Sequence, residues 1–461
     1  MRDNHLTKDE WLKHGKAARK KSPRSSLAEW SPALRKEDII GLLEESNHDR
    51  IPGLIAIRYG RMAMTPFTFF RGSAIIQARD LMTSPDSGIV LQACGDCHLM
   101  NFGGFATPER NMVFDINDFD ETFPAPFEWD IKRLAVSIVL CARELDFSKK
   151  DSVKAVEAAV DSYRDRLSEY GDMKQMEIWG STITIEDLIE SVNDNKDMLR
   201  RLKRKKEQAQ SRTSEALFPK LTSVVDGMAR IVDNPPYIFH FKENIAEFDK
   251  LSDRFRRHYA KTLRSDRKIL YESFVPQDIV VKVVGIGSVG TRCIVELLMA
   301  GDNDPLFLQV KEARRSVLEP PVGKSRFKSQ GQRVVEGQRL LQATGDIFLG
   351  WASIDKGHDY YVRQLRDMKV SAEPETFFPE TLVDYAKMCG WVLARAQAKA
   401  GNEHLIGGYL GSSDRFGEAI AKYAEAYADQ VEEDFAAFKK AIATGRLHTD
   451  VDETSEFSFL L

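Results

Sequence analysis

The chain has 461 residues, 43% of them hydrophobic, and a formal net charge of −4. This size and composition indicate a globular protein of two or three domains, and the nearly balanced charge gives no reason to expect a nucleic acid or an anionic membrane as a partner. The N-terminal residues lack the apolar core of a secretory signal, and no later run approaches the length of a membrane span. Five scattered cysteines do not suggest a disulfide framework. We therefore expect a cytoplasmic protein with reduced cysteines.

The first third of the chain changes from a polar arm to a helical region. Residues 1–48 are polar and basic at first and are expected to form an N-terminal arm. In residues 49–148, helical spacing surrounds the phrase TPFTFFRGSA, where Pro66 breaks the pattern and Arg71 follows a cluster of phenylalanines. We interpret this phrase as a buried aromatic elbow. Residues 128–145 place apolar side chains on one helical face and predict a helix.

Residues 149–268 predict an almost entirely helical insertion or cap. The basic run at 200–206, RRLKRKK, has no interleaved aromatic residues, so we interpret it as a solvated helix face and not as a nucleic-acid contact. The phrase NPPYIFHF at 234–241 interrupts the helical pattern.

Residues 269–370 predict a small antiparallel-sheet lobe. Apolar, β-branched runs between Ile279 and Ala313 indicate a three-stranded meander, and a helix is predicted over 331–343. The phrases IFLGWASI and DYYVRQL predict two more strands. The fold class is therefore α+β.

The C-terminal part of the chain returns to helical spacing. Residues 371–447 predict two helices, one of them bracketed by Pro379 and Gly401. The acidic tail at 448–461 is expected to be frayed.

The stretch from Cys94 to Asp130 concentrates acid and amide side chains. Asp96 is followed five residues later by Asn101, and an apolar run then leads to Asp115 and Asp118. Enzymes that transfer phosphoryl groups from ATP use one carboxylate to orient or deprotonate the acceptor, and an amide with a second carboxylate to hold Mg²⁺. The spacing therefore predicts a catalytic carboxylate at Asp96 and metal ligands among Asn101, Asp118 and Asp115.

A glycine loop is the second candidate element. Gly285, Gly287 and Gly290 follow one strand, and a later strand carries Lys311. In a dinucleotide-binding unit, residues 291–300 would be helical and an acid would follow about twenty residues on. In a protein kinase the same spacing joins two antiparallel strands over the ATP phosphates, and the next strand supplies a lysine. The β-branched residues and the tight DNDP turn favour the kinase arrangement.

Each of these elements also has a structural interpretation. A glycine-rich turn is often only a turn, and Lys311 beside Glu312 suits a solvated strand edge. The acids and amides of the first stretch, Asp120 included, suit loop and helix caps. The joint occurrence of a base, an amide, a metal carboxylate, a phosphate loop and a lysine favours the functional interpretation.

The cysteines of the first stretch raise a separate possibility. Cys94, Cys97 and His98 match the C-x-x-C-H pattern of haem attachment and are also candidate zinc ligands. Haem attachment requires export, and the other cysteines offer no second paired motif. We therefore interpret both cysteines as packing residues and His98 as a brace of the loop.

The phrase GDCHLMN at 95–101 resembles the catalytic loop of aminoglycoside phosphotransferases and choline kinases. This resemblance implies that Asp118 binds the metal, with Asp115 as the competing candidate, and that Asp130 braces the loop from its helix. Cys94 departs from the pattern, because that family usually has histidine there.

The whole chain also resembles the uncharacterised bacterial family catalogued as domain of unknown function 2252. The phrases CGDCHLMNFG, FDINDFDE, VVGIGSVGTRC and YYVRQLRDMK carry this resemblance, which covers roughly residues 50–440. In ordinary kinases the glycine loop precedes the catalytic loop, whereas here it follows Asp96 by about 190 residues. We therefore expect a circularly permuted, two-lobed protein kinase-like fold with a large helical insertion.

The first functional hypothesis is an ATP- and Mg²⁺-dependent phosphotransferase with a small-molecule or protein acceptor. Backbone amides of the Gly285–Gly290 loop, with Ser288, would cover the phosphates, and Lys311 would contact them. Glu336 on the following helix would hold that lysine in place. The backbone of Tyr361–Leu365 would face the adenine.

Three other hypotheses stay open. One is an ATP-binding scaffold without catalysis, similar to a pseudokinase. Another is an adenylyl transferase, since the same groups would hold ATP. The third is an NAD(P)-dependent oxidoreductase of the Rossmann type that uses the glycine loop.

Overall fold

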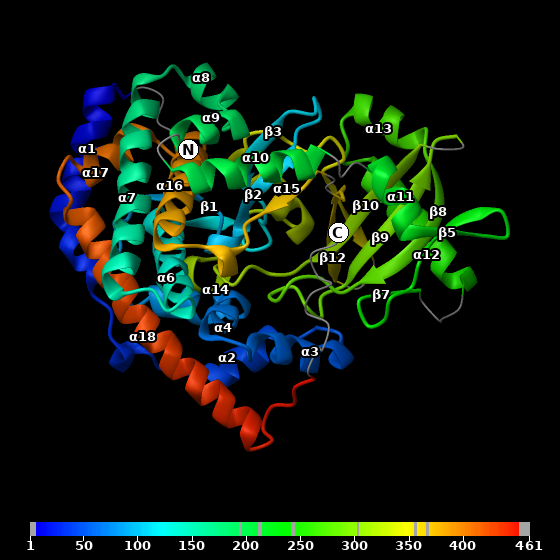
Figure 1. Ribbon diagram of the computed structural model, residues 1–461, viewed down its shortest axis with the longest axis horizontal. Coiled ribbons are helices and arrows are strands. Elements are labelled where there is room, and N and C mark those ends of the chain that lie inside the picture. Colours follow the sequence, from blue (N-terminus) through cyan, green and yellow to red (C-terminus); the bar gives the residue numbers. More distant parts are fainter. Residues whose placement is uncertain are drawn as a thin grey trace.

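The computed structural model describes residues 6–192, 195–210, 214–240, 245–301, 304–354, 357–365 and 368–450. Helices form one side of the molecule and a six-stranded antiparallel sheet forms the other, with short strands between them (Figure 1). The predicted α+β class is confirmed. Within the described residues, no helix is both long enough and apolar enough to cross a bilayer.

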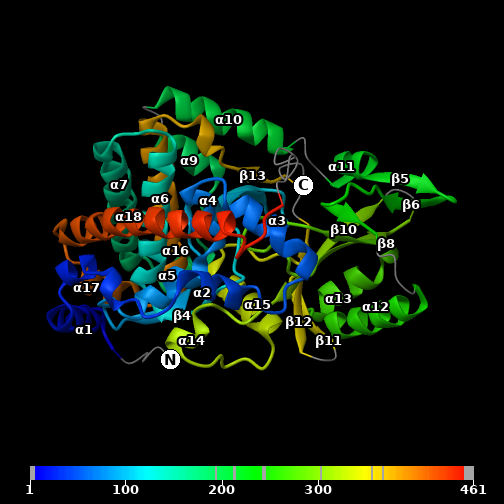
Figure 2. The same cartoon turned by 90° about the horizontal axis from the view of Figure 1, so that it is seen from below.

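Four long helices build the core of the helical side. They are α6 (Glu128–Glu144), α7 (Lys149–Asp172), α16 (Pro379–Ala400) and α18 (Arg415–Ala443). Helix α18 runs across α6 and α7 (Figure 2). Gly390 lets α16 approach α7 closely, because a Cβ at this position would lie 2.1 Å from the carbonyl oxygen of Ala159. The helix predicted over 128–145 and both C-terminal helices are confirmed.

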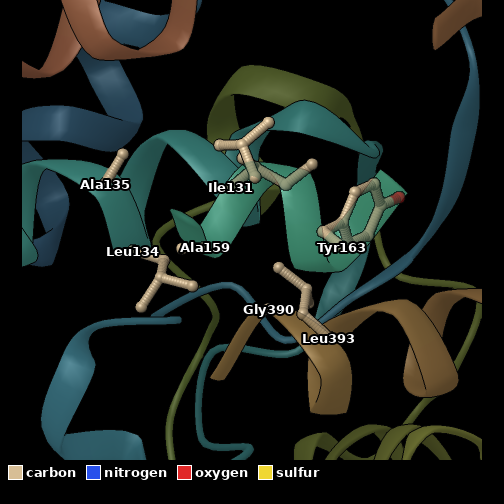
Figure 3. Close-up of a pocket in the computed structure, with 8 residues that line it drawn as sticks. Ile131, Leu134, Ala135, Ala159, Tyr163, Gly390 and Leu393 are labelled. Atoms are coloured by element: carbon tan, nitrogen blue, oxygen red, sulfur yellow. The ribbon is translucent and has the colours of Figure 1, made fainter. Parts of the chain in front are cut away.

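Helices α6, α7 and α16 line a small apolar pocket (Figure 3). Its volume is about 10 Å³, which is close to the space of a single water molecule. Only hydrophobic side chains, Tyr163 and Gly390 line it. It is a packing defect and offers no site for a ligand.

The N-terminal residues are not the polar arm that we expected. Helix α1 (Lys8–Lys21) begins with a capping box between Thr7 and Glu10, and it packs on α17 (Glu403–Leu410). A Cβ on Gly15 would lie 2.1 Å from the carbonyl oxygen of Leu405, so the two helices touch at their backbones. Helix α2 (Ile39–Ser46) buries its isoleucines and leucines. The amphipathic piece DIIGLLEES in the sequence corresponds to α2, whereas the polar composition of the preceding residues gave no sign of α1.

The aromatic elbow is confirmed. It is the helix α4 (Pro66–Gly72), which follows α3 (Pro52–Met62) and precedes α5 (Ala74–Leu81). Pro66 occupies the first turn of α4, where no backbone donor is needed, and Thr65 caps it. The three phenylalanines of α4 are buried.

The predicted insertion is less uniform than expected. Helix α7 packs against α6 and α16 and so belongs to the helical side. Further along, a β-hairpin that the helical prediction missed projects from the end of the molecule remote from α1 (Figures 1 and 2). The elements after α7 are α8 (Gln175–Gly180), α9 (Ile185–Ser191), α10 (Lys196–Gln210), α11 (Ser214–Leu221), β5 (Thr222–Val225), β6 (Met228–Ile231), β7 (Ile238–Phe239), α12 (Ile245–Ala260) and α13 (Ser265–Glu272).

The large sheet has the strand order β11-β12-β10-β9-β8-β7, and all its pairs are antiparallel. Helix α15 (Gln330–Leu341) follows β10 and packs against β11 and β12. The predicted meander, helix and two later strands are therefore confirmed. The strands not yet bounded are β8 (Val275–Lys282), β9 (Cys293–Met299), β10 (Pro305–Ala313), β11 (Gly350–Ile354) and β12 (His358–Gln364).

Short strands connect the helical side to this sheet. Strands β1 (Val90–Ala93) and β4 (Phe123–Pro126) pair with each other, and β2 (Phe102–Ala106) lies between β3 (Met112–Ile116) and β13 (Val370–Ser371). The remaining helical turns are η1 (Arg24–Ala28), η2 (Pro32–Leu34), η3 (Leu99–Asn101), α14 (Glu319–Val322) and η4 (Pro374–Thr376). The tail beyond residue 450, which we expected to be frayed, lies outside the described residues.

Candidate functional site

The loop at 94–101 connects β1 to β2 and is fixed by the start of α6. Asp130 accepts hydrogen bonds from the backbone N–H groups of Cys94, at 2.7 Å, and Gly95, at 2.9 Å. Gly95 has φ +91°, a conformation that favours glycine. Burial raises the pKa of Asp130 to about 6, even though the two N–H groups stabilise its charged form. The predicted bracing contact between Asp130 and this loop is present.

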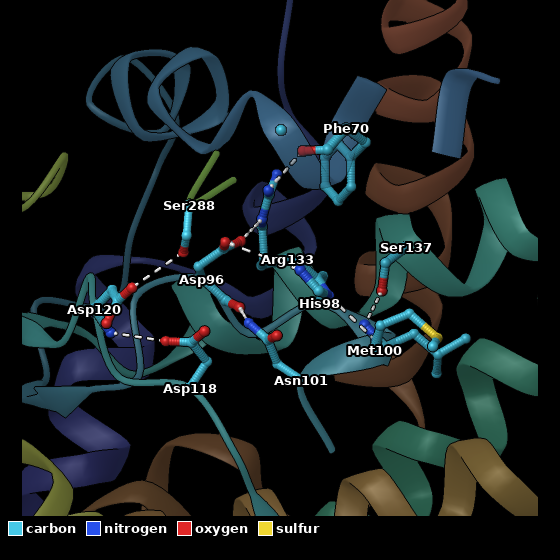
Figure 4. Close-up of polar contacts among 12 residues, drawn as sticks. Phe70, Asp96, His98, Met100, Asn101, Asp118, Asp120, Arg133, Ser137 and Ser288 are labelled. Carbon is cyan, nitrogen blue, oxygen red and sulfur yellow. Dashed lines mark hydrogen bonds and ion pairs between the residues drawn. The ribbon is translucent and has the colours of Figure 1, made fainter. Parts of the chain in front are cut away.

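Asp96 stands at the tip of the loop with part of its carboxylate exposed. Arg133 Nε donates to Asp96 Oδ1 at 2.8 Å, and Asn101 Nδ2 donates to the Asp96 carbonyl oxygen at 2.6 Å (Figure 4). Arg133 is itself fixed by Gln77 and by the carbonyl oxygen of Phe70. One carboxylate oxygen is thus oriented by an arginine, and the side chain stays 21% exposed.

His98 is buried beneath this loop as an uncharged imidazole. Its Nδ1 accepts a hydrogen bond from the Met100 N–H at 3.2 Å, so its proton lies on Nε2, which is 3.9 Å from Asp96 Oδ2. Burial, followed by the charges of Arg71 and Arg133, holds the pKa of His98 well below its usual range. Its contacts agree with a brace of the loop.

The acidic turn at 118–120 meets the sheet through Lys311. Lys311 Nζ lies 2.7 Å from Asp120 Oδ2 and 3.7 Å from Asp118 Oδ2. Burial disfavours a charge on this lysine, but the two carboxylates raise its pKa well above the usual value. Segments about 190 residues apart in the sequence therefore share one cluster of charges.

Three hydrogen-bond donors converge on Asp120. Besides Lys311, they are the Tyr361 hydroxyl, at 2.5 Å from Oδ1, and the Ser288 hydroxyl of the glycine loop, at 3.3 Å from Oδ2. Figure 4 shows the contact between Ser288 and Asp120. Although burial opposes it, the charge of Lys311 lowers the pKa of Asp120. These donors form a cradle for an anionic oxygen, which here is the carboxylate of Asp120.

Asp118 is the more open member of the acidic pair. Its side chain is 33% exposed, and its Oδ1 accepts from the Asp120 N–H at 3.1 Å. Burial and the neighbouring charge of Asp120 raise its pKa. Apart from the 3.7 Å approach of Lys311, Oδ2 of Asp118 has no hydrogen-bond partner among the described residues, so this oxygen is available to a cation.

The glycine loop joins the antiparallel strands β8 and β9. Residues 293–299 are a strand and not the helix that a dinucleotide-binding unit needs, so the Rossmann interpretation of this loop is wrong. Gly285 and Gly290 have φ +65° and +87°. Two hydrogen bonds hold the glycine loop. Arg61 of α3 donates to the Gly285 carbonyl at 2.6 Å, and the N–H of Ile51, just before α3, donates to the Gly290 carbonyl at 2.8 Å.

Asp115 does not have the open environment that a metal ligand needs. It is completely buried, and Arg395 Nη2 on α16 lies 3.0 Å from its Oδ1. Its Oδ2 also accepts from the Ala343 N–H at 2.7 Å. Both oxygens are therefore occupied inside the core, and the candidate metal role of Asp115 is corrected to a structural ion pair.

Glu336 does not hold Lys311. It lies on α15 but forms an ion pair with Arg339 of the same helix at 3.2 Å, whereas Lys311 pairs with the acidic turn. The expected adenine-facing backbone of Tyr361–Leu365 is also partly engaged. The N–H of Gln364 donates to Asp346, and the N–H of Leu365 donates to the carbonyl oxygen of Phe307.

The cysteines lie inside the protein. Cys94 and Cys97 are buried, and burial contributes to a raised pKa for both thiols. Across the described ranges, no three histidine, cysteine, aspartate or glutamate side chains are grouped to hold a metal ion. A zinc site at Cys94, Cys97 and His98 has no support in this geometry. Mg²⁺ differs, because it commonly takes one or two carboxylates and completes its shell with phosphate oxygens and water.

Sequence reasoning missed three members of the cluster, and two of them carried a usable signal. Arg133 lies three residues after Asp130 and hence on the same face of α6. Asp120 lies two residues after Asp118 in an acidic turn. The side chain of Tyr361 has no such signal, because its position depends on the pairing of β12 with β10.

Comparison with known protein families identifies the family of this chain. The profile of a family described as an uncharacterised protein conserved in bacteria, DUF2252, matches residues 50–441. The chain belongs to the DUF2252 family. The matched residues include loop 94–101, the acidic turn and the glycine loop of this DUF2252 protein. A search of the curated proteins and of the solved structures finds no match.

Proposed function

We propose that this DUF2252 protein is an ATP- and Mg²⁺-dependent phosphotransferase with a circularly permuted, kinase-like arrangement. One observation carries the proposal. Lys311, on the strand after the glycine-loop hairpin, lies within 3.7 Å of two carboxylates of the acidic turn, which follows the loop that holds Asp96. In this proposal the glycine loop, the buried lysine, the carboxylates of the acidic turn and the base Asp96 act on one nucleotide.

The order of elements in the sheet supports the proposal. A glycine loop between β8 and β9, a lysine on β10 and a later helix, α15, are the parts that protein kinases use to cover ATP phosphates. Here they follow the loop that carries Asp96, and α16 and α18 then return to the helical side. A permuted chain would give this order if its original termini lay close together on a surface.

The residues of the cluster fit a nucleotide with Mg²⁺. Backbone amides of the glycine loop, Ser288 and Lys311 would hold phosphate oxygens in the cradle that Asp120 now fills. Asp118 and Asn101 would hold Mg²⁺, which neutralises charge on the phosphates when it is bound. Asp118 has the exposed oxygen that this role needs.

Asp96 would act on the acceptor. With Oδ1 held by Arg133, its Oδ2 is left to accept the proton of an acceptor hydroxyl. The acceptor oxygen then bonds to the terminal phosphorus of ATP, the bond to the bridging oxygen breaks, and ADP leaves. The uncharged His98 keeps the loop in place and contributes no competing charge.

The proposal is tested by nucleotide binding and turnover of the full-length protein. We expect ATP with Mg²⁺ to raise the thermal unfolding temperature, and slow ADP formation to be measurable. Lys311→Met should abolish both effects. Lys154→Met, on the surface of α7, serves as a control that should change neither. If ATP with Mg²⁺ leaves the unfolding temperature of the wild type unchanged, the proposal is wrong.

One observation favours an ATP-binding protein without catalysis as the second candidate. Active protein kinases pair their lysine with a helix glutamate, whereas Lys311 pairs with Asp120 and Glu336 does not approach it. In that case ATP would bind without ADP being formed, and Asp96→Asn would change neither ATP binding nor ADP formation. Mass measurement of the product would also separate phosphoryl transfer from adenylyl transfer.

A further inference from the structure

Arg71 is a partly buried cation that the described residues leave without a hydrogen-bond or ion-pair partner. It lies on α4, its Nε is enclosed with no hydrogen-bond partner, and its side chain makes no hydrogen bond or ion pair to the residues that the structure describes. The ring of Phe67 lies 5.7 Å from its guanidinium carbon. Burying a guanidinium without hydrogen bonds is costly, so such a group calls for a ligand.

Lys132 provides an internal comparison. It is also a buried cation whose Nζ has no hydrogen-bond partner in the described part of the chain, but it is completely enclosed and lies 4.3 Å from the centre of the Tyr423 ring. Burial lowers the pKa of Lys132 to about 8, so it can relieve its cost by losing a proton. Arg71 keeps its charge at neutral pH and is partly exposed, so an anion from solution can reach it.

Arg71 follows Phe70 in the chain, and the Phe70 carbonyl oxygen accepts from the same Arg133 that binds Asp96. The carboxylates of Asp96 and Glu144 act on the charge of Arg71. Its backbone carbonyl lies 3.4 Å from where a Cβ on Gly287 would be, so α4 also touches the glycine loop. Glu144 is already engaged by the Thr65 hydroxyl at 2.7 Å.

The two arginines near Asp96, Arg133 and Arg71, differ in their hydrogen bonds. Arg133 uses Nε for Asp96 and its terminal nitrogens for Gln77 and the Phe70 carbonyl, so each of its three nitrogens donates to a protein group. Arg71 adds a second positive charge on the same side, with a free planar fork suited to two oxygens of one anion. The single negative charge of Asp96 cannot balance the positive charges of both arginines.

We propose that the acceptor carries an anionic group, a phosphate or a carboxylate, which Arg71 binds while the acceptor hydroxyl lies against Asp96. This inference rests on the proposed phosphotransferase function and names the class of its substrate. The nucleotide phosphates are assigned to Lys311 and Ser288, and the anion of the acceptor is assigned to Arg71.

The test uses simple anions as probes and needs neither ATP nor Mg²⁺. Sodium phosphate and sodium acetate, compared with chloride at equal ionic strength, are titrated into the wild type while the thermal unfolding temperature is recorded. We expect phosphate or acetate to stabilise the wild type, and which of them does so tells phosphate from carboxylate recognition. Arg71→Gln should weaken the apparent affinity about tenfold or more, and Arg71→Lys should retain part of it.

Two further variants locate the anion. Arg166→Gln removes an arginine that lies over Trp391 on the remote surface of α7, and it should leave anion binding unchanged. Lys311→Met should also retain anion binding, because the probe does not occupy the nucleotide cradle. An absent effect in the wild type, an equal effect in Arg71→Gln, or a loss in Lys311→Met with retention in Arg71→Gln would each overturn the assignment.

The same variants separate this inference from the proposed function. If ATP with Mg²⁺ fails to bind while phosphate binding depends on Arg71, the phosphotransferase proposal fails and the anion site stands. If ATP binds and turns over while Arg71→Gln binds the probes like wild type, only the anionic acceptor is wrong. In turnover, Arg71→Gln should raise the KM for the acceptor and leave the affinity for ATP unchanged, and a reversed pattern would assign Arg71 to the nucleotide.

Discussion

The two ends of one short acidic segment have opposite environments. Asp115 and its partner Arg395 are both completely enclosed, and the oxygens of that aspartate are satisfied by protein groups. Three to five residues later, Asp118 and Asp120 are 33% and 27% exposed and face Lys311 across the junction with the sheet. The closed pair holds β3 to α16, whereas the open pair keeps a carboxylate oxygen free. Identical side chains in one segment thus acquire a structural and a proposed chemical role from their surroundings.

The largest effect is expected at Asp96, whose partly exposed carboxylate lies in the loop before the open pair. Asp96→Asn keeps the size of the side chain and its contact with Arg133 but removes the proton acceptor. We expect turnover to fall by about 10²–10⁴-fold, which is the usual contribution of a general base, with no change in the affinity for ATP. Steady-state ADP formation and calorimetric titration of ATP measure the two effects. Undiminished turnover would remove Asp96 from the mechanism.

At the closed side we expect a loss of stability. Arg395→Met leaves Asp115 buried without its charge partner and should lower the free energy of unfolding by about 3–5 kcal/mol. Asp118→Asn, at the open side, should change it by less than about 1 kcal/mol, because water already reaches this carboxylate. Urea unfolding followed by circular dichroism compares them. Equal losses in the two variants would mean that the open pair is also structural.

Asp130 is buried like Asp115, and it gives a pH signature. Its folded pKa of about 6 lies above its ordinary value of 3.8. Between these values the native carboxyl holds a proton that the unfolded chain has released, so its contribution to the free energy of unfolding falls as pH rises, by on the order of 3 kcal/mol in total. Asp130→Asn should flatten the dependence of stability on pH in this range. A slope identical to that of wild type would contradict the assignment.

The same residue predicts the acid limb of activity. Below about pH 6 Asp130 becomes protonated and loses an acceptor for the N–H groups of Cys94 and Gly95. We therefore expect turnover to decline as pH falls through 6. A profile that stays flat down to pH 5 would separate the bracing contact from turnover.

The smallest effect is expected at Glu336. Among the residues that the structure describes, its one ion pair is with Arg339, at the partly exposed surface of α15. Glu336→Gln should change the free energy of unfolding by less than about 0.5 kcal/mol and leave ATP binding intact. A large loss of ATP affinity would restore the pairing with Lys311 that the sequence suggested.

Structural features could be predicted from the sequence where the residues involved are close together in the chain. The hairpin around the glycine loop and the position of Lys311 on a strand follow from spacing and turn residues. The bracing of loop 94–101 by Asp130 was implied by the resemblance to aminoglycoside phosphotransferases and choline kinases. Partners brought together by tertiary packing were not readable. Asp115 received the wrong role because its partner, Arg395, comes 280 residues later. Lys311 was given the wrong acid because helix geometry brings Glu336 onto Arg339 and not toward the sheet.

The most direct test of the central claim is calorimetric titration of a non-hydrolysable ATP analogue with Mg²⁺ into wild type, Lys311→Met and Asp118→Asn. If the glycine-loop sheet and the acidic turn hold one triphosphate between them, the wild type binds the analogue and each substitution weakens binding by about tenfold or more. Asp118→Asn should do so only when Mg²⁺ is present. Binding that is indifferent to both substitutions, or no binding to the wild type, would contradict the account.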